Sequence, residues 1–229
     1  MLVIFDIDGT LCRTSDLDDA CWRLAALEVL GIESMSTDWN DYPHSTDESI
    51  ASTLHERARG VPPQRADIDT LRDRFVAILQ EAHESTPEPM TQTPGASDFI
   101  TRLRCEGHGV AIATGGWRAS AIFKLECCGI EHDLIPSAFA CDAHPRTDII
   151  EIARARALEK GMHAEDDPNI VYVGDGLWDL AAARSLGIGF VGLATGRREL
   201  QLREAGANDV FSDFLDQGVF LEALRLATP

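Results

Sequence analysis

The chain has 229 residues, of which 45% are hydrophobic and 25% charged, and its formal net charge at pH 7 is −18. This length suits one large domain or a core with a smaller inserted domain, and the composition is that of an ordinary globular protein. The charge argues against a nucleic-acid partner, which needs clustered Lys and Arg, but a small anionic substrate stays open because bound Mg²⁺ can outweigh the global field.

The N-terminal apolar stretch does not resemble a targeting segment. Residues 2–5 are too few for a signal peptide and have no basic flank, and no later segment approaches the roughly 20 apolar residues of a membrane span. We therefore expect a cytoplasmic protein with no membrane partner. The cysteines form no Cys-x-x-Cys pair and most lie in apolar runs, so we expect reduced, buried thiols rather than disulfides or zinc ligands. They are Cys12, Cys21, Cys105, Cys127, Cys128 and Cys141.

The first predicted element is a buried parallel strand at residues 2–5, which runs directly into an acidic turn. The turn contains Asp6, Asp8, Gly9 and Thr10. Ligands of open α/β sheets bind at the carboxyl ends of the strands, so two carboxylates at this point can flank a metal and a reacting group. Gly9 allows the backbone to turn sharply there.

Residues 13–90 carry helical patterns and no strand. Apolar periodicity predicts a helix from Asp16 to Gly31, and a capping box of Ser45 and Glu48 predicts a second helix through about residue 58. A third helix follows, and residues 86–93 have the composition of a linker. Because this stretch interrupts a chain that begins with a parallel strand, we interpret residues 15–90 as an inserted helical cap domain. Residues 1–14 and 91–229 then form the catalytic core.

After residue 93 the strand and helix patterns alternate. Strands are predicted at 110–113, around 139, at 170–173, 190–193 and 210–211. Helices are predicted at 96–106, 118–128, 148–160, 178–186, 197–205 and from about 216. Repeated β-α units of this kind predict an α/β fold with a parallel sheet flanked by helices, joined to the all-helical insertion.

Two further strand ends are polar in a way that packing does not require. Thr114 and Gly115 follow the strand at 110–113 and offer a hydroxyl and backbone N–H groups suited to a phosphate. Asp175 follows the strand at 170–173, with Asp179 four residues later on the same helix face. Asp175 is therefore predicted to meet a metal, with Asp179 bracing the site.

These motifs, in this order, resemble the first, second and fourth motifs of the haloacid dehalogenase superfamily of hydrolases. The position of the helical insertion resembles the subgroup of phosphoglycolate phosphatase and β-phosphoglucomutase. The resemblance implies a Rossmann-like core, with Asp6 as nucleophile and Asp8 as general acid and base. It also implies Mg²⁺ held by Asp6, Asp8 through its backbone carbonyl, and Asp175, with phosphate bound by Thr114 and Gly115. Thr10 and Asp179 are supporting residues.

The third motif of the superfamily supplies a Lys, or sometimes an Arg, to neutralise the nucleophile and phosphate. In this chain the corresponding place contains His144, Pro145 and Arg146. Arg146 is the first choice for this role, catalytic and phosphate-binding, because its charge is permanent and its fork is bidentate. His144 is the second choice and Lys124 the third.

The function predicted by this resemblance is that of a Mg²⁺-dependent phosphatase acting on a small phosphorylated metabolite through an aspartyl phosphate. A phosphomutase is the main alternative, and a phosphoacceptor switch without turnover is a more distant one. Asp8 argues against family dehalogenases and phosphonate hydrolases, which lack a carboxylate there. A monomer or homodimer is expected, and the substrate is left open. Candidate specificity residues are His44, Thr46, Asp47 and Trp117.

Overall fold

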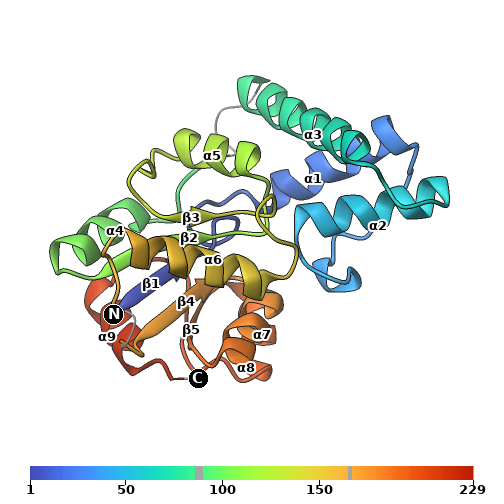
Figure 1. Ribbon diagram of the computed structural model, residues 1–229. Coiled ribbons are helices and arrows are strands. Elements are labelled where there is room, and N and C mark those ends of the chain that lie inside the picture. The colour runs from blue at the N-terminus through green and yellow to red at the C-terminus, as the bar shows by residue number, and fades with distance from the viewer. Residues whose placement is uncertain (86–89, 165–166, 229) are drawn as a thin grey trace.

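The computed structural model describes residues 1–85, 90–164 and 167–228, and its centre is a six-stranded parallel sheet (Figure 1). The strand order is β3-β2-β1-β4-β5-β6, so the first strand of the chain lies near the middle. This confirms the predicted α/β fold. The strands are β1 Leu2–Phe5, β2 Gly109–Ala113, β3 Ser137–Ala138, β4 Ile170–Gly174, β5 Gly189–Leu193 and β6 Val210–Phe211.

Helices cover both faces of the sheet. Successive side chains of a strand point to opposite faces, so a strand of consecutive apolar residues makes both faces apolar, and both must be buried. Val3 and Phe5 belong to one apolar core, which includes residues of α4 Ala96–Cys105, α5 Arg118–Cys127 and α9 Gln217–Leu226. Leu2 and Ile4 belong to the other, with residues of α6 Arg146–Glu159, α7 Leu177–Leu186 and α8 Gly196–Glu204. With both faces covered, the polar groups that follow the strands meet at the carboxyl edge of the sheet.

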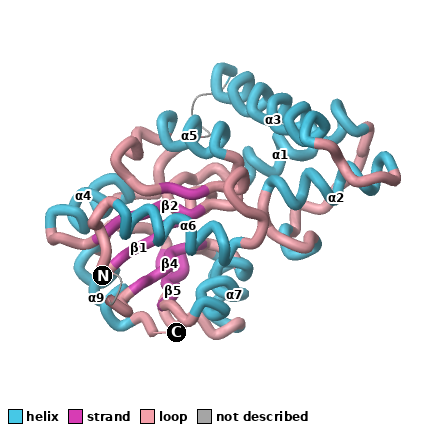
Figure 2. The backbone as a smooth tube through the Cα atoms, in the orientation of Figure 1, coloured by secondary structure: helices cyan, strands magenta, loops and turns pink. Residues whose placement is uncertain are grey.

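The helices of residues 15–85 lie together beyond this edge (Figures 1 and 2). We call residues 15–85 the helical segment. It contains α1 Ser15–Ala25, a π-helical turn Ala26–Leu30, a short 3₁₀ turn Trp39–Asp41, α2 Asp47–Arg59 and α3 Arg65–Ser85. The ring centroid of Trp22 in α1 lies 5.3 Å from that of Phe75 in α3 and 5.2 Å from that of Trp117 in the core. The apolar interior of the helical segment is therefore continuous with that of the core.

The two chain crossings between the core and the helical segment run side by side. The Arg13 N–H donates to the Thr91 carbonyl and the Thr93 N–H to the Leu11 carbonyl, each at 2.8 Å. The linker predicted at residues 86–93 is thus a paired, partly buried segment from Met90 onward, and its residues 86–89 lie outside the described part of the chain.

The capping box predicted at the start of α2 is wrong. The Ser45 hydroxyl donates to the Trp39 carbonyl at 2.9 Å, while the Glu48 carboxylate accepts from the indole of Trp117 at 2.8 Å. The helix begins at Asp47, with Thr46 as its N-cap residue. Partners distant in the sequence have replaced the local hydrogen bonds of a capping box.

The cysteines are all free thiols, as predicted, but three of them are not buried, and of these Cys127 is half-buried. Cys105 and Cys141 are exposed, because each lies just past the apolar residues of its element rather than among them. Among the helices of the described residues, none combines the length and the apolarity needed to cross a bilayer.

Candidate active site

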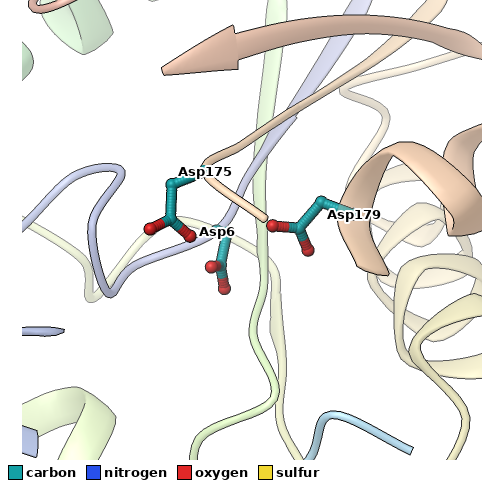
Figure 3. A group of neighbouring side chains, drawn as sticks. All are labelled: Asp6, Asp175 and Asp179. Atoms are coloured by element: carbon teal, nitrogen blue, oxygen red, sulfur yellow. The ribbon is translucent and has the colours of Figure 1, made fainter. Parts of the chain in front are cut away.

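Three carboxylates meet where β1 and β4 end. Asp6 follows β1, Asp175 follows β4, and Asp179 lies in the first turn of α7. All three side chains are buried, and one oxygen from each lies within 4.8 Å of the others (Figure 3). The sequence analysis predicted Asp6 and Asp175 as metal ligands and Asp179 as a supporting residue, and the structure brings all three together.

Burial makes it unfavourable for these carboxylates to be charged together. Desolvation raises the pKa of Asp6 and of Asp175, and it raises the pKa of Asp179 to about 7 despite the opposing effect of Arg146. A divalent cation among them would favour the charged forms, and carboxylate oxygens are the donors that Mg²⁺ prefers. The donor set of the described residues therefore fits Mg²⁺.

Asp179 makes hydrogen bonds that fix its orientation. Its Oδ2 accepts from the Gly176 N–H at 3.0 Å, and its Oδ1 lies 3.2 Å from the Tyr172 hydroxyl. The same hydroxyl lies 2.9 Å from the Ala113 carbonyl. With both oxygens engaged, Asp179 is suited to bracing the cluster, as the sequence predicts.

Arg146 reaches the carboxylate of Asp6. Its Nη1 lies 3.0 Å from Asp6 Oδ1, and its Nε lies 3.7 Å from Asp179 Oδ1. Its Nη2 donates to the carbonyl of Ser45 in the helical segment at 3.1 Å. One guanidinium therefore contacts both the predicted nucleophile and the helical segment. His144, the second choice for the third motif, is exposed and contributes its carbonyl to the Thr46 hydroxyl.

Lys124, the third choice, is also at the site but on a different carboxylate. Its ammonium is fully buried and lies 2.7 Å from Asp8 Oδ1, and it also forms an ion pair with Asp18 of α1. The Thr14 hydroxyl donates to the same Asp8 oxygen at 2.5 Å. The side chain of Asp8 is thus held away from the carboxylate cluster, and its predicted metal contact is through the backbone carbonyl. Thr10 is buried in the same turn.

The loop after β2 approaches the helical segment closely. The Thr114 side chain is buried, and its hydroxyl accepts from the Gly116 N–H at 3.2 Å. A Cβ at Gly115 would lie 2.5 Å from the Ser45 carbonyl oxygen and 2.6 Å from Arg146 Nη2. Glycine is therefore required at position 115 for this close approach.

The N-terminus of α2 docks on the same loop. The Asp47 N–H donates to the Gly115 carbonyl at 2.8 Å, and Asp47 Oδ2 accepts from the Trp117 N–H at 2.7 Å. Asp47 Oδ1 accepts from the indole of Trp22 at 3.1 Å. Burial raises the pKa of Asp47 to about 6. Of the predicted specificity residues, Thr46, Asp47 and Trp117 are thus buried at this contact, whereas His44 is exposed.

A cavity of ≈ 60 Å³ lies between the strand ends and the helical segment. Its core lining includes Asp6, Asp8, Thr114, Gly115, Gly116, Arg146, Asp175, Trp178 and Arg198. Its lining from the helical segment is Ser15, Asp18, Asp19, Trp22, Trp39, Ser45, Asp47 and Ile50. Asp47 is the one predicted specificity residue in this lining.

Sequence reasoning missed Asp18, Asp19, Trp178 and Arg198. Arg198 forms an ion pair with Asp175 and lies at the start of α8, directly after β5. The strand-end argument that identified the other motifs would have found it, since β5 ends at the same edge. Asp18 and Asp19 lie on a helix whose orientation toward the core no local pattern specifies.

Comparisons with known proteins agree with this geometry. The family described as haloacid dehalogenase-like hydrolase matches residues 1–187. A phosphoglycolate phosphatase of Mesorhizobium japonicum is 24% identical over 218 residues, covering 93% of this chain and 91% of that protein. The Arabidopsis thaliana protein SUPPRESSOR OF QUENCHING 1, chloroplastic, is 26% identical over 92% of this chain, which spans only 19% of that protein. The crystal structure of a hydrolase from Pseudomonas syringae has a TM-score of 0.73 at 23% identity and covers 99% of each chain, which shows the same fold.

Proposed function

The chain belongs to the haloacid dehalogenase-like hydrolase family and is a phosphoric monoester hydrolase; we propose that it cleaves a small phosphorylated metabolite through an aspartyl phosphate on Asp6. The observation that carries the proposal is the position of Asp6 at a buried strand end, with Arg146 Nη1 at 3.0 Å and the Thr114 loop beside it. A carboxylate nucleophile that attacks a phosphate dianion needs this kind of neutralising cation.

In the first half-reaction an Asp6 oxygen attacks phosphorus, and the bond from phosphorus to the leaving oxygen breaks. Arg146 compensates the charge that the phosphoryl oxygens bring beside Asp6, and the Thr114 hydroxyl and Gly115 N–H bind those oxygens. Asp8, in its protonated form, gives its proton to the leaving oxygen, so that the product leaves as an alcohol.

In the second half-reaction water attacks the aspartyl phosphate. Asp8, now a carboxylate, accepts a proton from this water, and inorganic phosphate leaves while Asp6 is regenerated. Lys124 and Thr14 hold Asp8 in one place through both steps. A bound Mg²⁺, held by Asp6, Asp175 and the Asp8 carbonyl, would further lower the repulsion between Asp6 and phosphate.

We further propose that residues 15–90 act as a cap that closes over the substrate. Arg146 and the Gly115 carbonyl both bind backbone groups at the start of α2, at Ser45 and Asp47. These contacts connect the phosphate-binding groups directly to the cap. Closure would exclude water other than the attacking molecule from the site.

The test is phosphate release from a panel of small phosphomonoesters with Mg²⁺, with EDTA, and in the variant Asp6→Asn. We expect release that is lost in both of the latter conditions and retained in Asp16→Asn, a control on an exposed carboxylate of α1. Release that persists in folded Asp6→Asn would contradict the assignment of the nucleophile. Phosphorus NMR separates the alternative of a phosphomutase, which would give an isomeric ester without free phosphate.

A further inference from the structure

The cavity wall supplied by the helical segment is acidic and aromatic. This wall contains the carboxylates of Asp18, Asp19 and Asp47 and the rings of Trp22 and Trp39. Among the described residues, no Lys or Arg of the helical segment lines the cavity. Since phosphate binds on the core side, this wall faces the leaving group of the substrate.

The cations close to the cavity are already paired with carboxylates. Arg146 is paired with Asp6, and Arg198 with Asp175. Lys124 is shared by Asp8 and Asp18. A second anionic group on the substrate would thus lie close to these carboxylates, and every cation near it would already be paired. Juxtaposed like charges of this kind are strongly unfavourable.

Asp19 has a carboxylate oxygen that can accept a hydrogen bond from the substrate. Asp47 accepts two hydrogen bonds and Asp18 is paired with Lys124, but Asp19 Oδ1 is buried without a hydrogen-bond partner in the described part of the chain. Arg23, one turn further along α1, donates to the Thr37 hydroxyl at 2.9 Å, and the charges of Arg198 and Arg23 act on Asp19 without a hydrogen bond to its Oδ1. A carboxylate oxygen that lines a cavity and lacks a donor from the protein is available to accept a hydrogen bond from a ligand.

The cavity beside the strand ends is small. A water molecule needs roughly 10–15 Å³ measured in this way, so about four to six water-sized positions fill a cavity of ≈ 60 Å³. The cavity is open to solvent on one side, so a longer leaving group would extend out of it.

Resting on the proposed phosphatase function, we propose that the leaving group is an alcohol without negative charge, whose hydroxyl or ammonium hydrogens are accepted by Asp19 Oδ1. The substrate class therefore differs from phosphoglycolate, which carries a carboxylate at this end. The neighbouring rings of Trp22 and Trp39 suit either donor, since they pack against a carbon chain and attract an ammonium group through cation–π contact.

The experiment compares esters of matched length that differ in one terminal group. These are 2-aminoethyl phosphate, 2-hydroxyethyl phosphate, phosphoglycolate and ethyl phosphate, the last with no polar end group. We expect kcat/KM for the amino or the hydroxy ester to exceed that for phosphoglycolate by about tenfold or more, because of the like-charge cost above. Whichever of these two esters is faster identifies the donor.

The variant Asp19→Asn tests the residue, and Asp16→Asn on the same helix is the matched control. The Asn side chain keeps the shape but loses the charge. We expect KM for the preferred ester to rise about tenfold while kcat/KM for ethyl phosphate stays within about twofold, since ethyl phosphate makes no contact that depends on Asp19. Asp16→Asn should leave all four values unchanged.

The outcomes separate this inference from the proposed function. Preferred hydrolysis of phosphoglycolate by the wild-type protein would overturn the inference and leave the phosphatase intact, and its loss in Arg198→Met would identify Arg198 as an anion receptor. Equal effects of Asp19→Asn on ethyl phosphate and on the preferred ester would also overturn it. No phosphate release from any ester would overturn the proposed function itself. The wild-type comparison decides the charge class even if Asp19→Asn does not fold.

Discussion

Replacing Lys124 by Met removes the buried positive charge that three neighbouring carboxylates share. Lys124 is buried, 2.7 Å from Asp8 and paired with Asp18, and its charge also acts on Asp47. Breaking a buried ion pair on one side costs about 3–5 kcal/mol, because the remaining charge is left uncompensated. For a chain of 229 residues this lowers Tm by about 6–20 °C. Methionine fills a similar volume, so the loss measures charge rather than a cavity.

The predicted loss depends on pH. Burial already raises the pKa of Asp47 to about 6 and that of Asp18 well above its usual range, with Lys124 opposing both shifts. Without Lys124 both values rise further. A folded-state pKa above the unfolded value lets the folded chain bind more protons, so stability falls as pH rises through that interval. The deficit of Lys124→Met is therefore expected to be larger at pH 8 than at pH 5.

The assay is thermal and urea unfolding of the wild type, Lys124→Met, Asp18→Asn and the double variant at pH 5 and pH 8. The double variant should be less destabilised than Lys124→Met, because one of the uncompensated charges is gone. Lys160→Met is the control, since Lys160 is exposed on the surface. A deficit that is the same at both pH values, or that the Asp18→Asn change makes worse, would refute this account of Lys124.

Other variants test the remaining contacts of the site. In Gly115→Ala, the new Cβ would lie 2.5 Å from the Ser45 carbonyl oxygen, so we expect kcat/KM to fall about 100-fold and urea unfolding to show a loss of about 1–3 kcal/mol. Tyr172→Phe removes the hydroxyl 2.9 Å from the Ala113 carbonyl and 3.2 Å from Asp179 and should cost about 1–3 kcal/mol in urea unfolding. Arg146→Lys keeps the charge but cannot contact Asp6 and Ser45 together, so kcat should fall about 100-fold in steady-state kinetics while the protein stays folded. Unchanged kcat in that variant would show that a point charge is enough.

The strand ends could be predicted because each strand is recognised from its own residues, and because the topology of a parallel sheet brings the strand ends to one edge. A run such as residues 2–5 predicts a strand, and parallel strands place all their carboxyl ends at one edge. Asp6, Thr114 and Asp175 could therefore be brought together without knowing the strand order. The capping-box prediction failed for the opposite reason. The partner of Glu48 is the indole of Trp117, which is distant in the sequence, and a local sequence pattern contains no information about such a partner.

Sequence reasoning treated Arg146 and Lys124 as alternatives for one role, whereas in the structure both contact carboxylates of the first motif. The resemblance provides one place for a cation, and Arg146 and Lys124 were compared for it. In the structure the two carboxylates of the first motif each have their own cation, Arg146 on Asp6 and Lys124 on Asp8. Helical side chains lean toward the N-terminus of their helix, which brings the Lys124 ammonium back along α5 toward the strand ends.

This arrangement couples the two parts of the molecule through charge. Lys124 contacts Asp8 of the core and Asp18 of the helical segment, and Arg146 contacts Asp6 and the Ser45 carbonyl of that segment. Movement of the helical segment away from the core would therefore remove a partner from each of the two cations that hold the predicted nucleophile and the predicted acid. The ion pairs Arg146–Asp6 and Lys124–Asp8 both lie within the core, so such a movement would keep the charge compensation at the two predicted catalytic carboxylates while it releases the contacts with Ser45 and Asp18.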